Sequence, residues 1–111
     1  MATVYKRLGA IASTGTIGTG DTTYTVPAST AAVISTITIC NQGSNGATYR
    51  IAISTTTSFV ADGYIVYNAT VAANETVFLT VGLTLDATNK YLLTSASAST
   101  VSFSVFGSEI S

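Results

Sequence analysis

The most constraining feature of this sequence is a run of alternating side chains over residues 33–41, Val-Ile-Ser-Thr-Ile-Thr-Ile-Cys-Asn. β-branched residues dominate the run, and their restricted χ1 rotamers suit a pleated strand better than a helix. A period of two places Ile37 and Ile39 on one face of the strand, and Ile34 and Cys40 on the other. We predict that the face with Ile37 and Ile39 points into a hydrophobic core, as do Ile51 and Phe103 in two later alternating runs.

A second alternating run over residues 47–54 follows a loop rich in glycine and asparagine. Two such runs joined by turn residues are typical of a β-hairpin. Short alternating segments recur at roughly ten-residue spacing along the rest of the chain, and no segment has the apolar repeat of a helix. The sequence therefore predicts an all-β fold, an antiparallel β-sandwich (jelly-roll-like or Ig-like) of about seven to nine short strands.

The first residues have a mixed character that leaves two interpretations open. Residues 1–12 are predicted to be an N-terminal arm or an edge strand, and residues 13–111 a single β-sandwich domain. Lys6 and Arg7 could keep an edge strand from pairing with a neighbouring molecule. Alternatively, Tyr5 and Leu8 could anchor the segment on an adjacent subunit, because large apolar side chains are uncommon in solvated tails.

Composition excludes several classes of function. The chain has no histidine, so a serine or cysteine triad lacks its usual base and a structural zinc site lacks ligands. Its four Lys and Arg residues do not form a nucleic-acid-binding patch, and no apolar run is long enough to span a membrane. We therefore predict a protein that is not an enzyme, with no catalytic residues, no cofactor, no metal, no nucleic acid partner and no membrane association.

Two single residues have simple structural interpretations. Cys40 is the only cysteine, so no intrachain disulfide is possible, and we interpret it as a small buried hydrophobe. Asp86, three residues before Asn89, is interpreted as a turn residue and not as a calcium ligand. The N-terminus lacks the apolar core of a signal peptide, so synthesis in a cytoplasm is expected.

Six tyrosines are the main aromatic residues with a polar tip, a residue type that is enriched at protein interfaces. Tyr64 and Tyr67 fall on opposite faces of one predicted strand. They therefore cannot both point into the core, and at least one is predicted to lie on the surface. The candidate partner-interface residues are Tyr5, Lys6, Arg7, Leu8, Phe59, Tyr64 and Tyr67.

Three segments carry a resemblance to a known family: residues 24–28 (Tyr-Thr-Val-Pro-Ala), 32–41 (Ala-Val-Ile-Ser-Thr-Ile-Thr-Ile-Cys-Asn) and 49–54 (Tyr-Arg-Ile-Ala-Ile-Ser). Together they resemble small virion structural proteins of tailed bacteriophages, cyanophages among them. The later stretches that fit the same pattern are 74–76, 82–85 and 102–107. The resemblance implies a β-sandwich without catalytic residues that resides in the virion and is made in the host bacterial cytoplasm.

The resemblance suggests a capsid decoration (cement) protein that binds and stabilises the assembled shell as a homo-oligomer, such as a trimer. Its partners would then be further copies of itself and the major capsid protein or other virion proteins. One alternative is a neck, baseplate or tail-fibre module of the same class of phage. Another is a carbohydrate-binding module for host attachment, which the absence of tryptophan disfavours.

Overall fold

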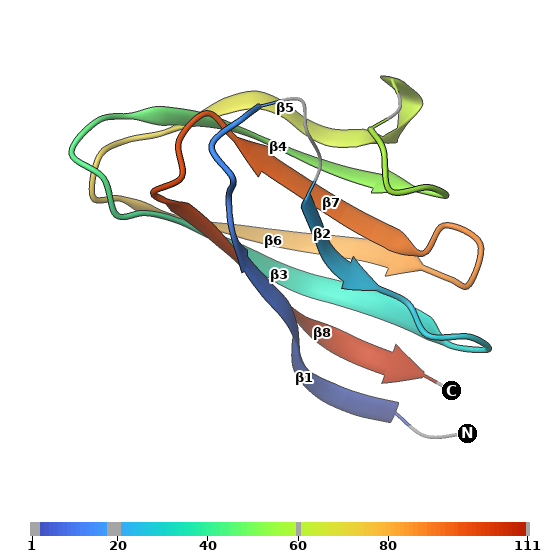
Figure 1. Ribbon diagram of the computed structural model, residues 1–111. Coiled ribbons are helices and arrows are strands. Elements are labelled where there is room, and N and C mark those ends of the chain that lie inside the picture. Colours follow the sequence, from blue (N-terminus) through green and yellow to red (C-terminus); the bar gives the residue numbers. More distant parts are fainter. Residues whose placement is uncertain (1–2, 18–20, 60, 111) are drawn as a thin grey trace.

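The computed structural model describes residues 3–17, 21–59 and 61–110 and contains eight β-strands (Figure 1). The strands are β1 Thr3–Ala12, β2 Asp21–Thr25, β3 Ala31–Asn41, β4 Ala47–Ser54, β5 Tyr64–Val71, β6 Thr76–Leu85, β7 Tyr91–Ala96 and β8 Val101–Ile110. A short 3-10 turn, η1 Ala61–Gly63, leads into β5, and the described residues contain no α-helix. No helix in this part of the chain is long and apolar enough to cross a membrane. The predicted all-β class is confirmed.

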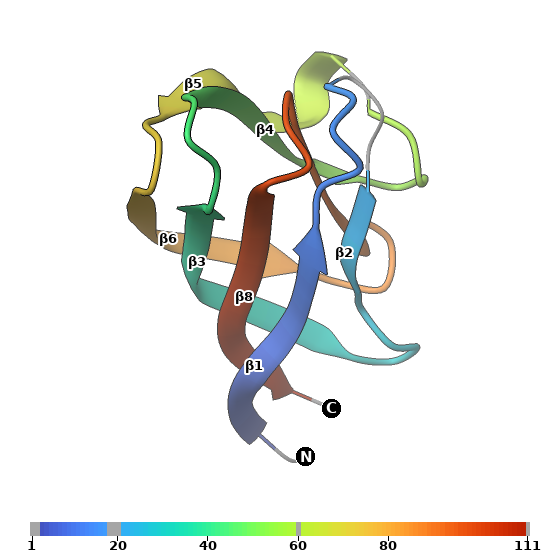
Figure 2. The ribbon, with the colours of Figure 1, turned by 60° about the vertical axis from the view of Figure 1, so that its left-hand side comes forward.

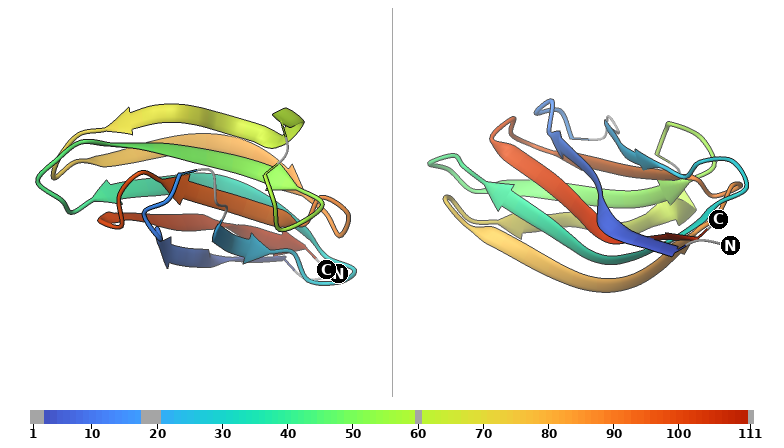
Figure 3. Two further views of the ribbon diagram at one scale, coloured as in Figure 1. Left: turned by 45° about the horizontal axis from the view of Figure 1, so that its top comes forward. Right: turned by 90° about the horizontal axis from the view of Figure 1, so that it is seen from below.

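The eight strands form two four-stranded antiparallel sheets with the orders β1-β8-β3-β6 and β2-β7-β4-β5. The sheets lie face to face as two layers (Figure 3). Eight strands in two Greek keys make a jelly roll, whereas an Ig-like sandwich divides seven strands between sheets of four and three. The predicted sandwich is therefore confirmed, and the strand order selects the jelly-roll form.

The hydrophobic core is the apolar layer between the two sheets. Ile37, Ile39 and Phe103 enter it from one sheet and Ile51 from the other, and none of the four is more than 1% exposed. The Tyr49 ring meets Phe103 edge-on across the layer, with ring centroids 6.3 Å apart. The inward positions predicted for these four residues are confirmed.

Ile34 lies on the opposite face of β3 from the one that simple alternation predicts. Ile34 and Ile37 should lie on opposite faces, yet both are fully buried in the core. The pairing of β3 with β8 shifts register between Ile34 and Thr36, so Ser35 is the additional residue of a β-bulge. The bulge displaces the start of the strand by one residue, which turns Ile34 inward and leaves Val33 half-buried.

Cys40 is half-buried, so its interpretation as a small buried hydrophobe was wrong. It follows Ile39, which points into the core, in a regular part of β3. Its side chain therefore lies on the outer face of the sheet, in register with Ser102 of β8 and Thr76 of β6.

Two glycines permit close backbone approaches that shape the sandwich. A Cβ atom on Gly107 would collide with the carbonyl oxygen of Val33 in the neighbouring strand β3. A Cβ atom on Gly9 would collide with the carbonyl oxygen of Thr23. Because Gly9 lies in β1 and Thr23 in β2, this second approach brings the two sheets together along one edge.

The buried position of Ile34 can be tested by truncation. Ile34→Ala should lower the free energy of unfolding by about 2–5 kcal/mol, because it leaves a cavity in the core. Thr38→Ala, on the outer face of the same strand, should cost no more than about 1 kcal/mol. Urea unfolding of both variants measures the difference, and equal losses would mean that the bulge does not turn Ile34 inward.

Candidate interaction surfaces

An aromatic–arginine cluster, made of Arg50, Phe59, Tyr64 and Tyr67, lies on the outside of the sheet that contains β4 and β5. The rings of Phe59 and Tyr64 stack with centroids 5.1 Å apart, and Tyr64 meets Tyr67 edge-on at 4.8 Å. The guanidinium carbon of Arg50 lies 4.2 Å from the Tyr67 centroid and 5.7 Å from that of Tyr64. A guanidinium at these distances is attracted by the aromatic ring quadrupoles.

Irregular pairing of β5 explains why the two tyrosines lie together. Its register with β4 shifts twice, between Tyr49 and Ile51 and again between Ile51 and Ala52. Breaks of this kind end the strict alternation of side chains. Tyr64 and Tyr67, predicted to face opposite sides, therefore reach the same side, where Tyr67 is 59% exposed.

Arg50 is a member of the cluster that was not among the candidate interface residues predicted from the sequence. It lies between the core residues Tyr49 and Ile51, so the alternation of β4 directs it outward. Its Nε donates a hydrogen bond of 2.8 Å to Oδ1 of Asn68, whose φ of 55° is in the left-handed region. Within the described residues, no carboxylate lies at ion-pair distance from Arg50. That alternation was the sequence signal that could have identified it.

The other predicted set, at the N-terminus, belongs to β1, which pairs with β8 at the edge of its own sheet; residues 1 and 2 lie outside the described part. Tyr5 is 67% exposed, and its hydroxyl lies 2.8 Å from the Ser35 hydroxyl. Arg7 is also exposed, whereas Leu8 is half-buried against the core. The role of these residues in binding a partner stays a prediction.

Lys6 takes part in a polar link between the two sheets that the sequence did not reveal. Its Nζ lies 3.3 Å from Oε1 of Glu109 in β8, and the hydroxyl of Tyr24 in β2 donates a hydrogen bond to the same carboxylate. This hydrogen bond, assisted by Lys6 and opposed by burial, holds the pKa of Glu109 below its ordinary value of 4.5. Burial, together with the Glu109 carboxylate, raises the pKa of Tyr24.

The structure does not bring the two predicted sets together. β1 packs beside β2 at one edge of the sandwich, whereas β5 is the last strand at the other edge of its sheet (Figure 2). The N-terminal residues and the aromatic–arginine cluster are therefore separate surfaces, each of which could meet a different neighbour.

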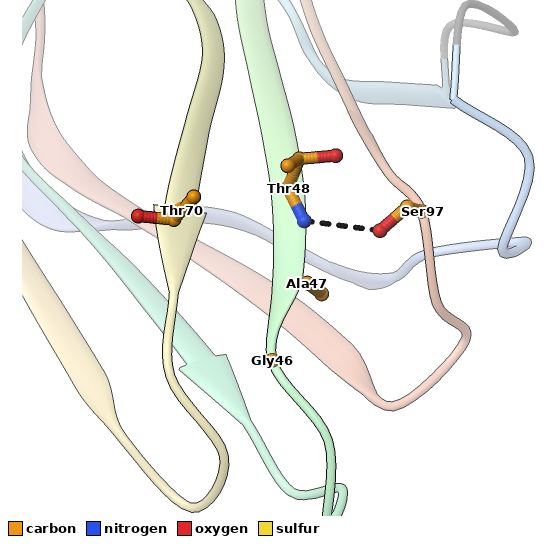
Figure 4. A pocket seen from close by; sticks show the side chains of 5 residues that line it. All are labelled: Gly46, Ala47, Thr48, Thr70 and Ser97. Carbon is orange, nitrogen blue, oxygen red and sulfur yellow. Dashed lines mark hydrogen bonds between the residues drawn. The ribbon is translucent and has the colours of Figure 1, made fainter.

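Two surface hollows are lined almost entirely by side chains that do not ionise. The first, of about 250 Å³, is open and lined by Gly46, Ala47, Thr48, Thr70 and Ser97, with the Thr48 N–H donating to the Ser97 hydroxyl at 3.0 Å (Figure 4). The second, of about 350 Å³, is lined by Ile53, Ser54, Thr55, Asp62, Gly63 and Asn89. Acid–base catalysis needs a positioned proton donor and acceptor, and the only ionisable side chain among these residues is Asp62.

The acidic residues in the described part of the chain form no cluster of three or more potential metal ligands. The carboxylate of Asp86 instead accepts hydrogen bonds from the backbone N–H groups of Thr88 and Asn89, each at 2.8 Å. These two bonds lower the pKa of Asp86, that from Asn89 contributing most. Asp86 is therefore a turn residue, as the sequence predicted.

No protein-family model matches the chain, and no curated protein matches it in sequence. Among solved structures, it is similar to the T13 viral particle of infectious bursal disease virus, with a TM-score of 0.52 and 11% identity over 97% of this chain and 29% of that chain. The Gt strain of the same virus gives a TM-score of 0.51 and 11% identity over 97% of this chain and 30% of that chain. The chain thus spans less than a third of the length of these viral chains.

The capsid asymmetric unit of cyanophage Pam1 gives a TM-score of 0.45 and 18% identity over 97% of this chain and 82% of that chain. A likeness at this TM-score supports no inference. At 11% identity, the two likenesses to infectious bursal disease virus establish the fold and nothing more specific.

The contacts of the Glu109 carboxylate with Tyr24 and Lys6 predict that the folded protein loses stability in acid. The pKa of Glu109 is lower in the folded chain than in the unfolded chain, so its contribution to stability is complete above 4.5 and is lost as the pH falls through the folded value. Glu109→Gln should therefore lose less stability than the wild type between about pH 5 and about pH 3. Urea midpoints at both pH values measure this loss. Asp62→Asn, at an exposed position away from this link, is the control and should retain the wild-type slope; equal slopes for all three proteins would contradict the prediction.

Proposed function

We propose that this protein is a non-enzymatic structural component of a virion, and specifically a capsid decoration protein that binds the assembled shell as a homo-oligomer. The observation that carries the proposal is the jelly roll itself, which runs from β1 to β8. Jelly rolls occur in viral capsid domains. The superposition of 97% of the chain on part of the particle of infectious bursal disease virus supports the same assignment.

The surface supports a role in contacts with other chains. Among the described residues, five large apolar side chains are between 44% and 69% exposed: Val4, Tyr5, Ile65, Tyr67 and Phe78. They lie on β1, β5 and β6, which are edge strands of the two sheets. Exposed aromatic residues often anchor protein interfaces, and a surface with only 8% charged residues repels other chains weakly. Contacts on several sides are what a protein packed in a shell requires.

A carbohydrate-binding module is the second candidate, because jelly rolls also occur in lectin domains. Its best site would be the aromatic–arginine cluster. There, however, the Tyr64 ring stacks on Phe59, and the Arg50 guanidinium lies over the Tyr67 ring. These contacts occupy ring faces on which a sugar would stack, so the geometry favours a protein partner.

Location in the particle tests the proposed function against the neck, baseplate and fibre alternatives. We expect a reconstruction of virions that contain this protein to place its density on the outer surface of the shell, repeated with the lattice of the capsid. Density confined to the tail, neck or baseplate would contradict a decoration role. Binding of the isolated protein to a glycan array, with no density on the particle, would instead favour the carbohydrate module.

The candidate surfaces predict which side chains matter for shell binding. Tyr67→Ala and Tyr5→Ala should each weaken co-sedimentation with capsids that lack the protein, because both remove an exposed aromatic contact. Thr57→Ala, in the exposed loop before β5, is the control and should bind as the wild type does. Wild-type binding by both tyrosine variants, with unchanged melting temperatures, would place the contact elsewhere on the sandwich.

A further inference from the structure

The four edge strands of the two sheets are not equally protected against pairing with another chain. An exposed edge offers unpaired N–H and C=O groups, and proteins usually blunt it with charge, bulges or short length. β1 carries Lys6 and Arg7 and has a bulge at Leu8. β2 is five residues long and begins with Asp21, and β5 has two register shifts.

β6 lacks charge and is not short, although its pairing with β3 shifts register once, between Thr80 and Leu83. It is ten residues long, Thr-Val-Phe-Leu-Thr-Val-Gly-Leu-Thr-Leu, with no charged residue and no proline. Exposed and half-buried residues alternate along it without interruption as far as Leu83. It forms the outer edge of its sheet, on the side opposite β1 (Figure 3, right). A long edge strand without charged residues or proline is a template for strand pairing.

The sequence of β6 indicates what would pair with it, because it is nearly palindromic about Thr80. In an antiparallel pair of two β6 strands with Thr80 opposite Thr80, Val77 meets Leu83 and Leu79 meets Val81, all on the half-buried face. On the exposed face, Thr76 meets Thr84. No like charges oppose each other anywhere in this register.

The remaining pair in this register joins an exposed phenylalanine of one copy to a glycine of the other. Phe78 is 69% exposed, the most of the large apolar side chains in the described part of the chain, and it falls opposite Gly82 of the second copy. No atom lies within 4 Å of where a Cβ on Gly82 would be, so the glycine leaves open space on the same face. An aromatic side chain that covers a glycine in the neighbouring strand is a known means of stabilising sheet edges.

We propose that two copies of this protein associate through antiparallel pairing of their β6 strands about a two-fold axis at Thr80. The two four-stranded sheets then continue as one sheet across the dimer. The contact uses the same surface of both copies and therefore closes at two, unlike the trimer suggested by the sequence resemblance. This inference rests on the homo-oligomer part of the proposed function and not on capsid binding.

A charge at the two-fold axis tests the contact. Thr80→Lys places two ammonium groups opposite each other and should weaken dimerisation by about tenfold or more. Thr70→Lys, at an exposed threonine of the edge strand β5, is the matched control and should dimerise as the wild type does. Sedimentation equilibrium measures both, with circular dichroism to verify folding. A mixture of Thr80→Lys with Thr80→Glu should restore the dimer, because the opposed charges then attract.

Cysteine cross-linking tests the register in a Cys40→Ser background. Residues directly opposite in an antiparallel pair have Cα atoms about 4.5–5.5 Å apart, within the range of a disulfide. Thr80→Cys should therefore form an intermolecular disulfide on mild oxidation. Thr84→Cys should not, because Thr84 of the second copy would lie eight positions away along the strand, roughly 27 Å.

Several outcomes would overturn the proposal. These are a wild-type protein that is monomeric at every concentration, a wild-type trimer, a dimer that Thr80→Lys leaves intact, and equal cross-linking at Thr80 and Thr84. A monomer whose shell binding is lost in Thr80→Lys would mean that a capsid strand occupies this edge instead. A dimer that fails to bind capsids would leave the inference standing and reject the decoration role, whereas capsid binding by a monomer would do the reverse.

Discussion

Burial of the apolar layer between the two sheets is the interaction on which the rest of this structure depends. The chain has a single cysteine and therefore no internal disulfide, and Lys6–Glu109 is the ion pair found within its described residues. Apolar burial is then the main term that can offset the entropy lost on folding. The bulge at Ser35 serves this burial, because it lets β3 direct both Ile34 and Ile37 into the layer.

The same requirement explains how the edges of the sandwich are closed. Gly9 lets β1 approach the backbone of β2, and the Tyr24–Glu109 hydrogen bond joins the two sheets near this edge. At the opposite edge, β6 is a long strand with no charged residue and with an exposed phenylalanine. One side of the molecule is therefore closed by its own contacts, and the other has the form of a surface for a neighbouring chain. This asymmetry suits a protein that works within an assembly.

The candidate surfaces were only partly accessible to sequence reasoning. Phe59, Tyr64 and Tyr67 could be named from residue type, since tyrosine and phenylalanine are common at interfaces. Their convergence on Arg50 depends on two register shifts in β5, which no local pattern encodes. The link between Tyr24 and Glu109 joins residues 85 positions apart, so it too exists only once the sheets have formed.

The sequence by itself determined the class of the fold and most of the core, because the period of two and the β-branched composition are local properties of each strand. Ile37, Ile39, Ile51 and Phe103 could be placed inward on that basis. Tertiary structure decided the jelly-roll order and the inward turn of Ile34. These features depend on which strands pair and in which register, and that choice is made by the total burial and hydrogen bonding of distant segments.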